Sequence, residues 1–191
     1  LHKTFATPTG GGGPGAGAVG CKAFLEPYLP QSAILSEGEH LQVRAFNGNF
    51  LVVVKALAYL LTLGREGIPE AAENAVLNAN YLMRRIQGTF QPAFDRICMH
   101  EFVLGLEEFK KETGVSALDV AKSLIDRGHP SPHHVLPPPS SMRALMLEPT
   151  ETESRETLDQ AAEVFRQLYQ LAHTDPETMR TAPPQCPDRT A

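Results

Sequence analysis

The sequence has 191 residues, of which 42% are hydrophobic and 20% are charged, and its formal net charge at pH 7 is −5. This length suits one domain, or one domain with part of another, and the composition is typical of a globular protein. An acidic chain offers no basic surface for nucleic acid or for an anionic membrane, so we expect no nucleic-acid or membrane partner. The three cysteines, Cys21, Cys98 and Cys186, form no disulfide or metal motif and suit a reducing compartment.

The first twenty residues are rich in glycine and have no helical periodicity, which predicts an ordered loop. Residues 15–20 match the pattern GxGxxG, but no apolar strand precedes them, so a dinucleotide-binding turn is disfavoured. The glycine run does not end in Gly-Lys-Ser or Gly-Lys-Thr, which excludes a phosphate-binding P-loop. A flexible linker is the plain alternative to an ordered active-site loop.

Residues 21–40 are expected to form a connector with a short helical turn at residues 21–25. Asn49 is placed to cap a helix that runs to Leu63, with Gly64 as its stop. This helix is apolar almost all round, which predicts that it lies buried between layers. The apolar run 50–63 contains Lys55 and is shorter than the roughly 20 residues of a membrane span.

A second helix is predicted from Pro69 to Gly88, followed by a strand over 99–104. The apolar face of that helix is expected to hold Ala72, Val76, Ala79, Met83 and Ile86. A capping-box pattern at Ser116 predicts a third helix that ends at Gly128. Its inward residues are expected to be Leu118, Ala121, Leu124 and Ile125.

Residues 129–141 are expected to form a proline-rich loop, and residues 144–147 a short strand. The last helix is expected to begin near Ser154, with an irregular tail after Asp175. Its buried face should hold Leu158, Ala161, Phe165, Leu168 and Ala172. Strands that alternate with helices predict an α/β or α+β domain with helices packed on a short sheet.

Lys3 is the leading candidate for chemistry, because it follows His2 and precedes the four glycines Gly10–Gly13. A lysine amine attacks an aldehyde only when it is neutral, and pyridoxal phosphate enzymes hold their cofactor on such a lysine. His2 could donate a hydrogen bond to a cofactor phosphate. Glycines let the main chain approach a cofactor or another backbone without a Cβ clash. A surface lysine is the default alternative.

These residues also carry a family resemblance. Residues 1–5 (LHKTF), Pro8 and the glycine run resemble the cofactor-lysine segment of the glycine cleavage system P-protein family, glycine dehydrogenase (decarboxylating). The resemblance continues over ENAVLNANY (73–81), MHEFVL (99–104), LDVAK (118–122) and EPTETES (148–154). It is greatest to the separate C-terminal-half subunit of bacteria and archaea.

The resemblance implies the C-terminal part of a type I pyridoxal phosphate (aspartate aminotransferase-like) fold. Residues 1–40 would close the large cofactor domain, 41–175 would form a small α+β domain, and 176–191 an irregular tail. Lys3 would be the Schiff-base lysine, with His2 as a second cofactor-binding residue. The implied enzyme decarboxylates glycine and transfers the aminomethyl group to the lipoyl arm of the H-protein.

The implied partners are the N-terminal half or subunit of the P-protein, the lipoylated H-protein and glycine, in a hetero- or homo-oligomer. The implied location is cytoplasmic, or mitochondrial in a eukaryote. Two departures keep alternatives open: Thr9 stands where the family has histidine, and residues 137–143 replace a more apolar run. The alternatives are a catalytically silent interaction module and a type I pyridoxal phosphate enzyme for another amino acid.

The remaining polar residues are interpreted as structural. His100 and Glu101 are adjacent on the expected strand, where successive side chains face opposite ways, so they should not share a site. His133 and His134 lack a nearby carboxylate or cysteine in sequence, so no metal site is expected. The acidic residues Glu148, Glu151 and Glu153 precede a helix, where carboxylates favour the dipole. Arg44 and Arg143 are weak candidates for gripping a substrate carboxylate.

Overall fold

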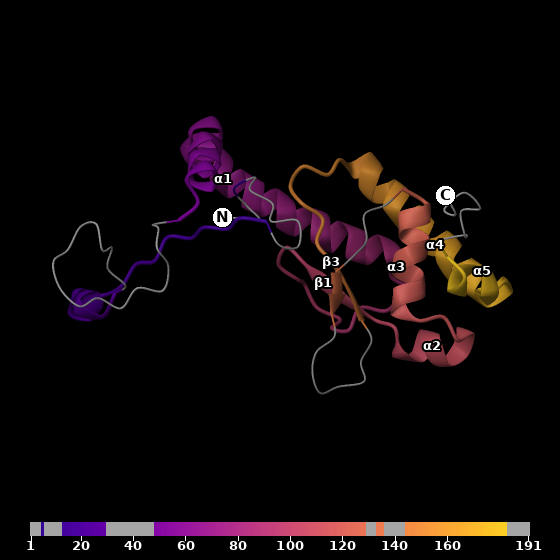
Figure 1. Cartoon of the computed structure of the whole chain (residues 1–191). Coiled ribbons are helices and arrows are strands. Elements are labelled where there is room, and N and C mark those ends of the chain that lie inside the picture. The colour runs from indigo at the N-terminus through magenta and orange to yellow at the C-terminus, as the bar shows by residue number, and fades with distance from the viewer. Residues whose placement is uncertain (1–4, 6–12, 30–47, 129–132, 136–143, 183–191) are drawn as a thin grey trace, which may run out of the picture. The chain divides into compact units, whose positions relative to one another are not determined.

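The computed structural model describes residue 5 and residues 13–29, 48–128, 133–135 and 144–182 (Figure 1). The chain forms two compact units, residues 1–68 and residues 69–191. The expected domain boundary near residue 40 falls outside the described residues and stays a prediction.

The first unit contains the 3₁₀ helix η1 (Ala23–Tyr28) and the N-terminal part of the long helix α1 (Phe50–Ile86). The Asn49 side chain donates a hydrogen bond to the carbonyl oxygen of Gly15 at 2.6 Å. The backbone of α1 leaves the helical conformation at Gly64, where φ is +64°. A positive φ favours glycine, so the predicted stop at Gly64 is confirmed.

The expected burial of helix 50–63 is wrong for this chain. Only Val52 and Ala56 are buried along it, whereas Phe50, Leu51 and Leu61 are more than 70% exposed. Pro69 also differs from its predicted place, because helical residues resume directly after Gly64 and Pro69 lies inside α1. Pro69 lies five residues after the break at Gly64, so the backbone hydrogen bond that it cannot make is one near the restart of the helix.

The second unit is built around a three-stranded antiparallel sheet of order β1-β3-β2. Its strands are β1 (Phe102–Gly105), β2 (His133–Val135) and β3 (Ala144–Leu147). Residues 91–93 pair with the free side of β1 through an isolated bridge between Pro92 and Leu104. β2 corrects the expectation of an uninterrupted loop over 129–141. β1 is shorter than the predicted strand, since residues 99–101 lie before it.

Besides the second half of α1, the described part of this unit contains four helices: α2 (Glu107–Thr113), α3 (Ala117–Asp126), α4 (Arg155–Thr174) and α5 (Pro176–Arg180). The sequence reading missed α2. It also assigned an irregular tail after Asp175, but Asp175 caps α5 by accepting from Thr178 N. A proline at the first helical position suits this start. Residues 183–191 lie outside the described part.

The core joins the sheet to the helices. Its largest fully buried side chains are Ile86, Phe90, Leu104, Leu106, Val115, Val120, Leu145, Leu168 and Met179. Ala79, Met83 and Ile86 are buried as predicted, whereas Ala72 is exposed. On α4, Leu158, Phe165, Leu168 and Ala172 are buried as predicted.

The predicted inward face of α3 is half wrong. Ser116 and Asp119 do form the capping box, and Ala121 and Leu124 are buried. Leu118 and Ile125, however, are 49% and 55% exposed, and Ala117 and Val120 occupy the core in their place. The predicted residues and the residues that are in fact buried both recur at helical spacing, and the two sets are offset by about one position. Hydrophobic periodicity alone therefore could not decide which of the two faces the core.

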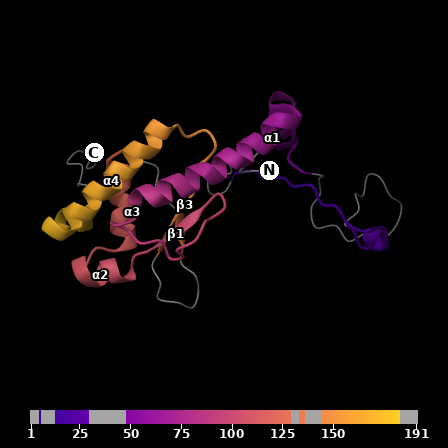
Figure 2. The ribbon, with the colours of Figure 1, turned by 180° about the vertical axis from the view of Figure 1, so that it is seen from behind.

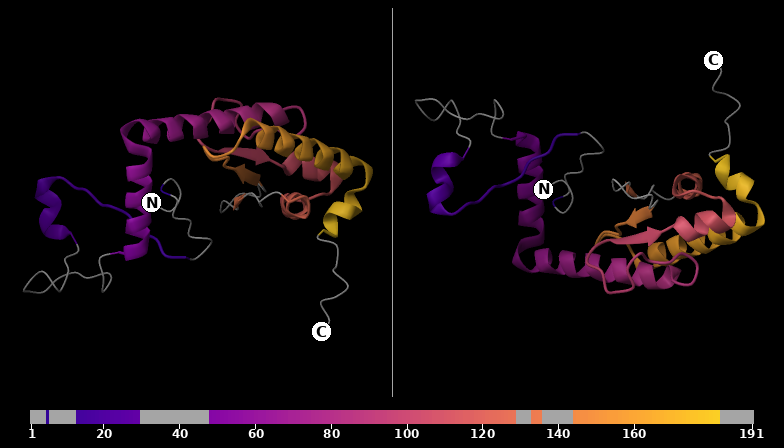
Figure 3. Two further views of the ribbon diagram at one scale, coloured as in Figure 1. Left: turned by 90° about the horizontal axis from the view of Figure 1, so that it is seen from above. Right: turned by 90° about the horizontal axis from the view of Figure 1, so that it is seen from below.

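The second half of α1 and α4 lie side by side, as seen from behind in Figure 2 and from above and below in Figure 3. Asp159 on α4 links them, because its Oδ1 accepts from the Tyr81 hydroxyl and from Arg85 Nε, each at 2.8 Å. Arg166 adds a hydrogen bond from Nη2 to the carbonyl oxygen of Arg85 at 2.8 Å. These bonds fix α4, and with it the loop that precedes it, against α1.

Candidate functional site

The residues chosen from sequence for cofactor chemistry, Lys3 and His2, lie outside the described part of the chain. Thr9, Arg44 and Arg143 do as well. For His133 and His134 only the backbone of β2 is described. The roles assigned to Lys3 and His2 therefore stay predictions.

The described residues near that segment are attached to the N-terminal part of α1. The ring of Phe5, two positions after Lys3, contacts Tyr59 edge-on with 5.6 Å between centroids. Gly15 accepts its hydrogen bond from Asn49, directly before the helix. Gly15, Gly17 and Gly20 have open space where a Cβ would project. That side of the backbone is therefore accessible to a ligand or to another part of the protein.

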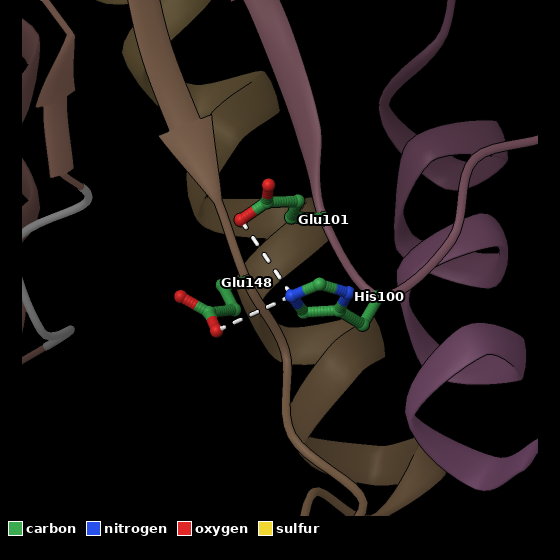
Figure 4. Close-up of side chains that lie close together, drawn as sticks. All are labelled: His100, Glu101 and Glu148. Atoms are coloured by element: carbon green, nitrogen blue, oxygen red, sulfur yellow. Dashed lines mark ion pairs between the residues drawn. The ribbon is translucent and has the colours of Figure 1, made fainter. Parts of the chain in front are cut away.

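A second group of polar side chains was interpreted as structural from the sequence. His100, Glu101 and Glu148 each offer a ligating atom, and these atoms lie within 4.8 Å of one another. His100 Nε2 is 3.8 Å from Glu101 Oε2 and 3.8 Å from Glu148 Oε1 (Figure 4). The imidazole nitrogen thus faces both carboxylates. We call these three residues the His-Glu-Glu cluster.

The structure contradicts the expectation that His100 and Glu101 point apart. That expectation required both residues to lie on a strand, but β1 begins only at Phe102. His100 and Glu101 belong to the preceding loop, where the alternation of a strand does not apply. Glu148 joins them because it directly follows β3, and Phe102 pairs with Leu147 in the antiparallel register. Glu101, directly before β1, and Glu148, directly after β3, therefore adjoin the same end of this strand pair.

Two asparagines of α1 hold the loops that carry the cluster. Asn80 Nδ2 donates to the carbonyl oxygen of Cys98 at 2.8 Å, and Asn80 Oδ1 accepts from Cys98 N at 3.0 Å. Asn78 Nδ2 donates to the carbonyl oxygens of Thr150 at 2.8 Å and Glu153 at 3.1 Å. In each loop, the backbone that is held lies two residues from a member of the cluster: Cys98 is two positions before His100, and Thr150 is two positions after Glu148.

Sequence reasoning missed the role of these asparagines. Asn has a low helix propensity, because its side chain competes for backbone hydrogen bonds. The predicted helix contains three Asn residues, Asn74, Asn78 and Asn80, and these were therefore the available signal. Cys98 is partly buried against the core, and burial raises the pKa of its thiol. Cys21 is exposed.

The cluster combines one imidazole with two carboxylates beside the start of β1 and the end of β3. The His100 side chain is about half exposed, whereas that of Glu148 is 18% exposed. Such a set can hold a cation between the carboxylates, either as the imidazolium of His100 or as a bound metal ion. The remaining acids before α4, Glu151 and Glu153, are only partly exposed.

The comparison with known families decides the classification of this chain. The family model described as "Glycine dehydrogenase, C-terminal domain" matches residues 71–180, which include the sheet, α2 to α5 and the His-Glu-Glu cluster. The chain belongs to this family.

Curated relatives of this glycine dehydrogenase family cover nearly the whole chain. It is 53% identical over 195 residues to the probable glycine dehydrogenase (decarboxylating) subunit 2 of Treponema denticola, covering 96% of this chain and 40% of that protein. It is 46% identical over 200 residues to the protein of the same name from Fervidobacterium nodosum, covering 99% of this chain and 42% of that protein. The chain thus spans about two fifths of these relatives' length.

Two solved structures share the fold. A crystal structure of glycine decarboxylase (P-protein) of the glycine cleavage system has a TM-score of 0.55 at 22% identity, over 66% of this chain and 28% of that one. The Sphingomonas wittichii serine palmitoyltransferase has a TM-score of 0.53 at 15% identity, over 64% of this chain and 30% of that one. The described domain is therefore the small α+β part of a type I pyridoxal phosphate fold, as expected.

Proposed function

We propose that this chain is the C-terminal part of a pyridoxal phosphate-dependent glycine dehydrogenase (decarboxylating), with Lys3 as the residue that holds the cofactor. The whole enzyme would remove the carboxyl group of glycine and pass the aminomethyl group to the lipoyl arm of the H-protein. The observation that carries the proposal is similarity along almost the entire chain: a relative named as subunit 2 of this enzyme aligns with 99% of it.

The chain's own residues have limited and definable roles in this proposal. Lys3 would hold the cofactor through Nζ, and His2 would donate a hydrogen bond to its phosphate. When bound, pyridoxal phosphate supplies an electron sink for the bond that breaks at the substrate's α-carbon. The open backbone at Gly15, Gly17 and Gly20 supports close approach of a ligand or partner on that side. Phe5 and Asn49 would position the segment on α1.

The surface of the first unit supports the proposal that further protein packs against this chain. Helix residues before Gly64 expose large apolar side chains, among them Phe50, Leu51, Val53, Leu57 and Leu61. An exposed apolar surface of this kind marks a protein or membrane contact. Within the described residues, no helix has the length and apolar character to cross a membrane. Because this chain covers only 40–42% of the relatives named as subunit 2, we assign this surface to the rest of the enzyme, meaning the large cofactor domain and the N-terminal-half partner subunit.

The test uses the full-length parent co-expressed with its partner subunit. Borohydride reduction in the presence of pyridoxal phosphate, followed by peptide mapping, should place the label on Lys3. Lys3→Ala should abolish the label and reduce exchange of carbon dioxide with glycine by several orders of magnitude, whereas Lys22→Ala should leave both unchanged. Exchange at the unaltered rate in the Lys3→Ala enzyme would contradict the proposed role of Lys3.

A catalytically silent interaction module is the second candidate, and the sequence departures at Thr9 and 137–143 favour it. A folded parent that takes no label at Lys3 would support this module. If Lys3 is labelled but glycine gives no carbon dioxide, a panel of other amino acids would identify a different substrate. A cytoplasmic location forms part of the proposal, supported by the free thiols Cys21 and Cys98.

A further inference from the structure

We propose that the His-Glu-Glu cluster is a binding site for a divalent metal ion of the zinc type, with His100 Nε2, Glu101 and Glu148 as its three protein ligands. The site lies in the small domain, within residues 69–191, and its argument is independent of the pyridoxal phosphate proposal. It needs no residue outside the described part of the chain.

The distances suit a metal ion with little rearrangement. Zinc binds imidazole nitrogen and carboxylate oxygen at about 2.0–2.2 Å, so its ligand atoms in a tetrahedral site are roughly 3.3–3.6 Å apart. In the cluster, His100 Nε2 lies 3.8 Å from an oxygen of each glutamate, and the whole set is within 4.8 Å. Contraction by a few tenths of an ångström per ligand would complete the geometry. Three protein ligands leave one coordination position for water.

The charges of the cluster favour a cation at this place. Glu101 and Glu148 each offer a carboxylate oxygen within 4.8 Å of the other, and two like charges this close repel each other. Glu148 is the less exposed of the two, with 18% of its side chain accessible. A divalent cation between the carboxylates would offset this repulsion. The neutral imidazole is the form that ligates a metal.

The loops that supply the ligands are fixed in advance. Asn80 holds the backbone of Cys98, two residues before His100, and Asn78 holds Thr150, two residues after Glu148. Both asparagines come from one helix, so the two loops are positioned by a common element. Preorganised ligands lower the cost of ordering the site when the metal binds. A bound ion would in turn tie the start of β1 to the end of β3.

The test is zinc titration of the full-length parent, co-expressed with its partner subunit, by isothermal titration calorimetry at pH 7.5, with thermal unfolding measured in parallel. The unaltered chain should bind one zinc ion at a site that requires the cluster. Because loss of an outer-sphere contact already costs about 10–100-fold in metal affinity, His100→Gln and Glu148→Gln should each weaken binding at least about tenfold. At free zinc about 100 times its dissociation constant, the unfolding equilibrium constant should fall roughly 100-fold.

Matched controls address zinc bound elsewhere. His173→Gln removes another histidine near a carboxylate, since His173 Nε2 is 3.8 Å from Glu112 Oε2, and it should not change the affinity. The double variant His133→Gln/His134→Gln should also bind as the unaltered chain does. Binding lost in a control variant but kept in His100→Gln would overturn the proposal. So would the absence of saturable binding at about 1 mM zinc, well above the dissociation constants of protein zinc sites.

A spectroscopic readout distinguishes the ligands directly. When cadmium-113 replaces zinc, its NMR chemical shift should be that of a cadmium ion bound by nitrogen and oxygen ligands, with no sulfur ligand. A shift that reports sulfur would assign the metal to a cysteine and contradict the proposal. If His100→Gln and Glu148→Gln lower the melting temperature equally with and without zinc, the cluster acts as an ion pair alone, which also overturns it.

Discussion

Asn80 is joined to Cys98 by two hydrogen bonds, one from its Nδ2 to the carbonyl oxygen and one from the backbone N–H to its Oδ1. The same Nδ2 also donates to the carbonyl oxygen of Val76 at 2.8 Å. A helix side chain thus satisfies both backbone groups of a residue in a loop 18 positions away. This arrangement connects α1 to the approach of β1 and supports the His-Glu-Glu cluster.

Asn80→Ala should therefore destabilise the chain by about 1–3 kcal/mol, because it leaves partly buried backbone groups of Cys98 without partners. The measurement is urea unfolding followed by circular dichroism. Glu73→Ala, at an exposed position on the same helix, is the control and should change stability by less than about 0.5 kcal/mol. Equal effects of the two substitutions would show that Asn80 does not hold the loop.

Tyr81→Phe should raise the pKa of Asp159. The Tyr81 hydroxyl bond is the main cause that holds this carboxyl below its ordinary value, followed by Arg85 and Arg155. A lowered carboxyl pKa stabilises the folded state above the unfolded value of about 3.9, and this contribution is lost as pH falls through the folded value. The stability difference between the unaltered chain and Tyr81→Phe should thus be largest above about pH 5 and shrink in acid.

The check is a titration of the Asp159 carboxyl by carbon-13 NMR, with unfolding measured at several pH values. Tyr28→Phe, at a 77% exposed ring, serves as the control and should shift neither quantity. An Asp159 pKa that stays equally low in Tyr81→Phe would assign the shift to the two arginines instead.

Phe90→Ala should destabilise the second unit by about 3–5 kcal/mol, because truncation of a buried aromatic ring loses its transfer free energy and leaves a cavity. Phe90 is 1% exposed and contacts the rings of Phe109, Phe165 and Tyr169 at 4.9–5.7 Å between centroids. Phe94→Ala removes the same side chain where it is 64% exposed and should cost under about 1 kcal/mol. Thermal and chemical unfolding compare the two; similar losses would contradict the assigned core.

Gly114→Ala should cost more than Gly128→Ala, although the two glycines have nearly equal φ values of +73° and +76°. Each substitution pays about 1–2 kcal/mol for a Cβ in the left-handed region. At Gly114 the new Cβ would also collide with Arg180 Nη2, which donates to the Thr113 carbonyl oxygen at 3.1 Å, whereas Gly128 has open space. Displacing this bond adds about 0.5–1.5 kcal/mol.

A double-mutant cycle measures that additional cost. In an Arg180→Ala background, Gly114→Ala and Gly128→Ala should destabilise the chain equally in urea unfolding. A difference that persists without Arg180 would show that the extra cost has another origin.

Several elements followed from local chemistry and were predictable. The capping box of Ser116 and Asp119, the N-cap Ser154 and the helix break at Gly64 depend on neighbouring residues only. β2 was not predictable in this way, because its three residues become a strand only by pairing with β3. Leu118 and Ile125 were misassigned for a related reason, since the choice of buried stripe on α3 depends on what packs against it.

The sequence by itself determined the family resemblance, the choice of Lys3 and most helix ends, because motifs and caps are encoded in consecutive residues. Tertiary structure alone decided that His100, Glu101 and Glu148 meet. Their proximity requires the strand to begin at Phe102, the antiparallel pairing of Phe102 with Leu147, and two asparagines of α1 that hold the loops. Each of these is a long-range contact, and no local pattern specifies such contacts.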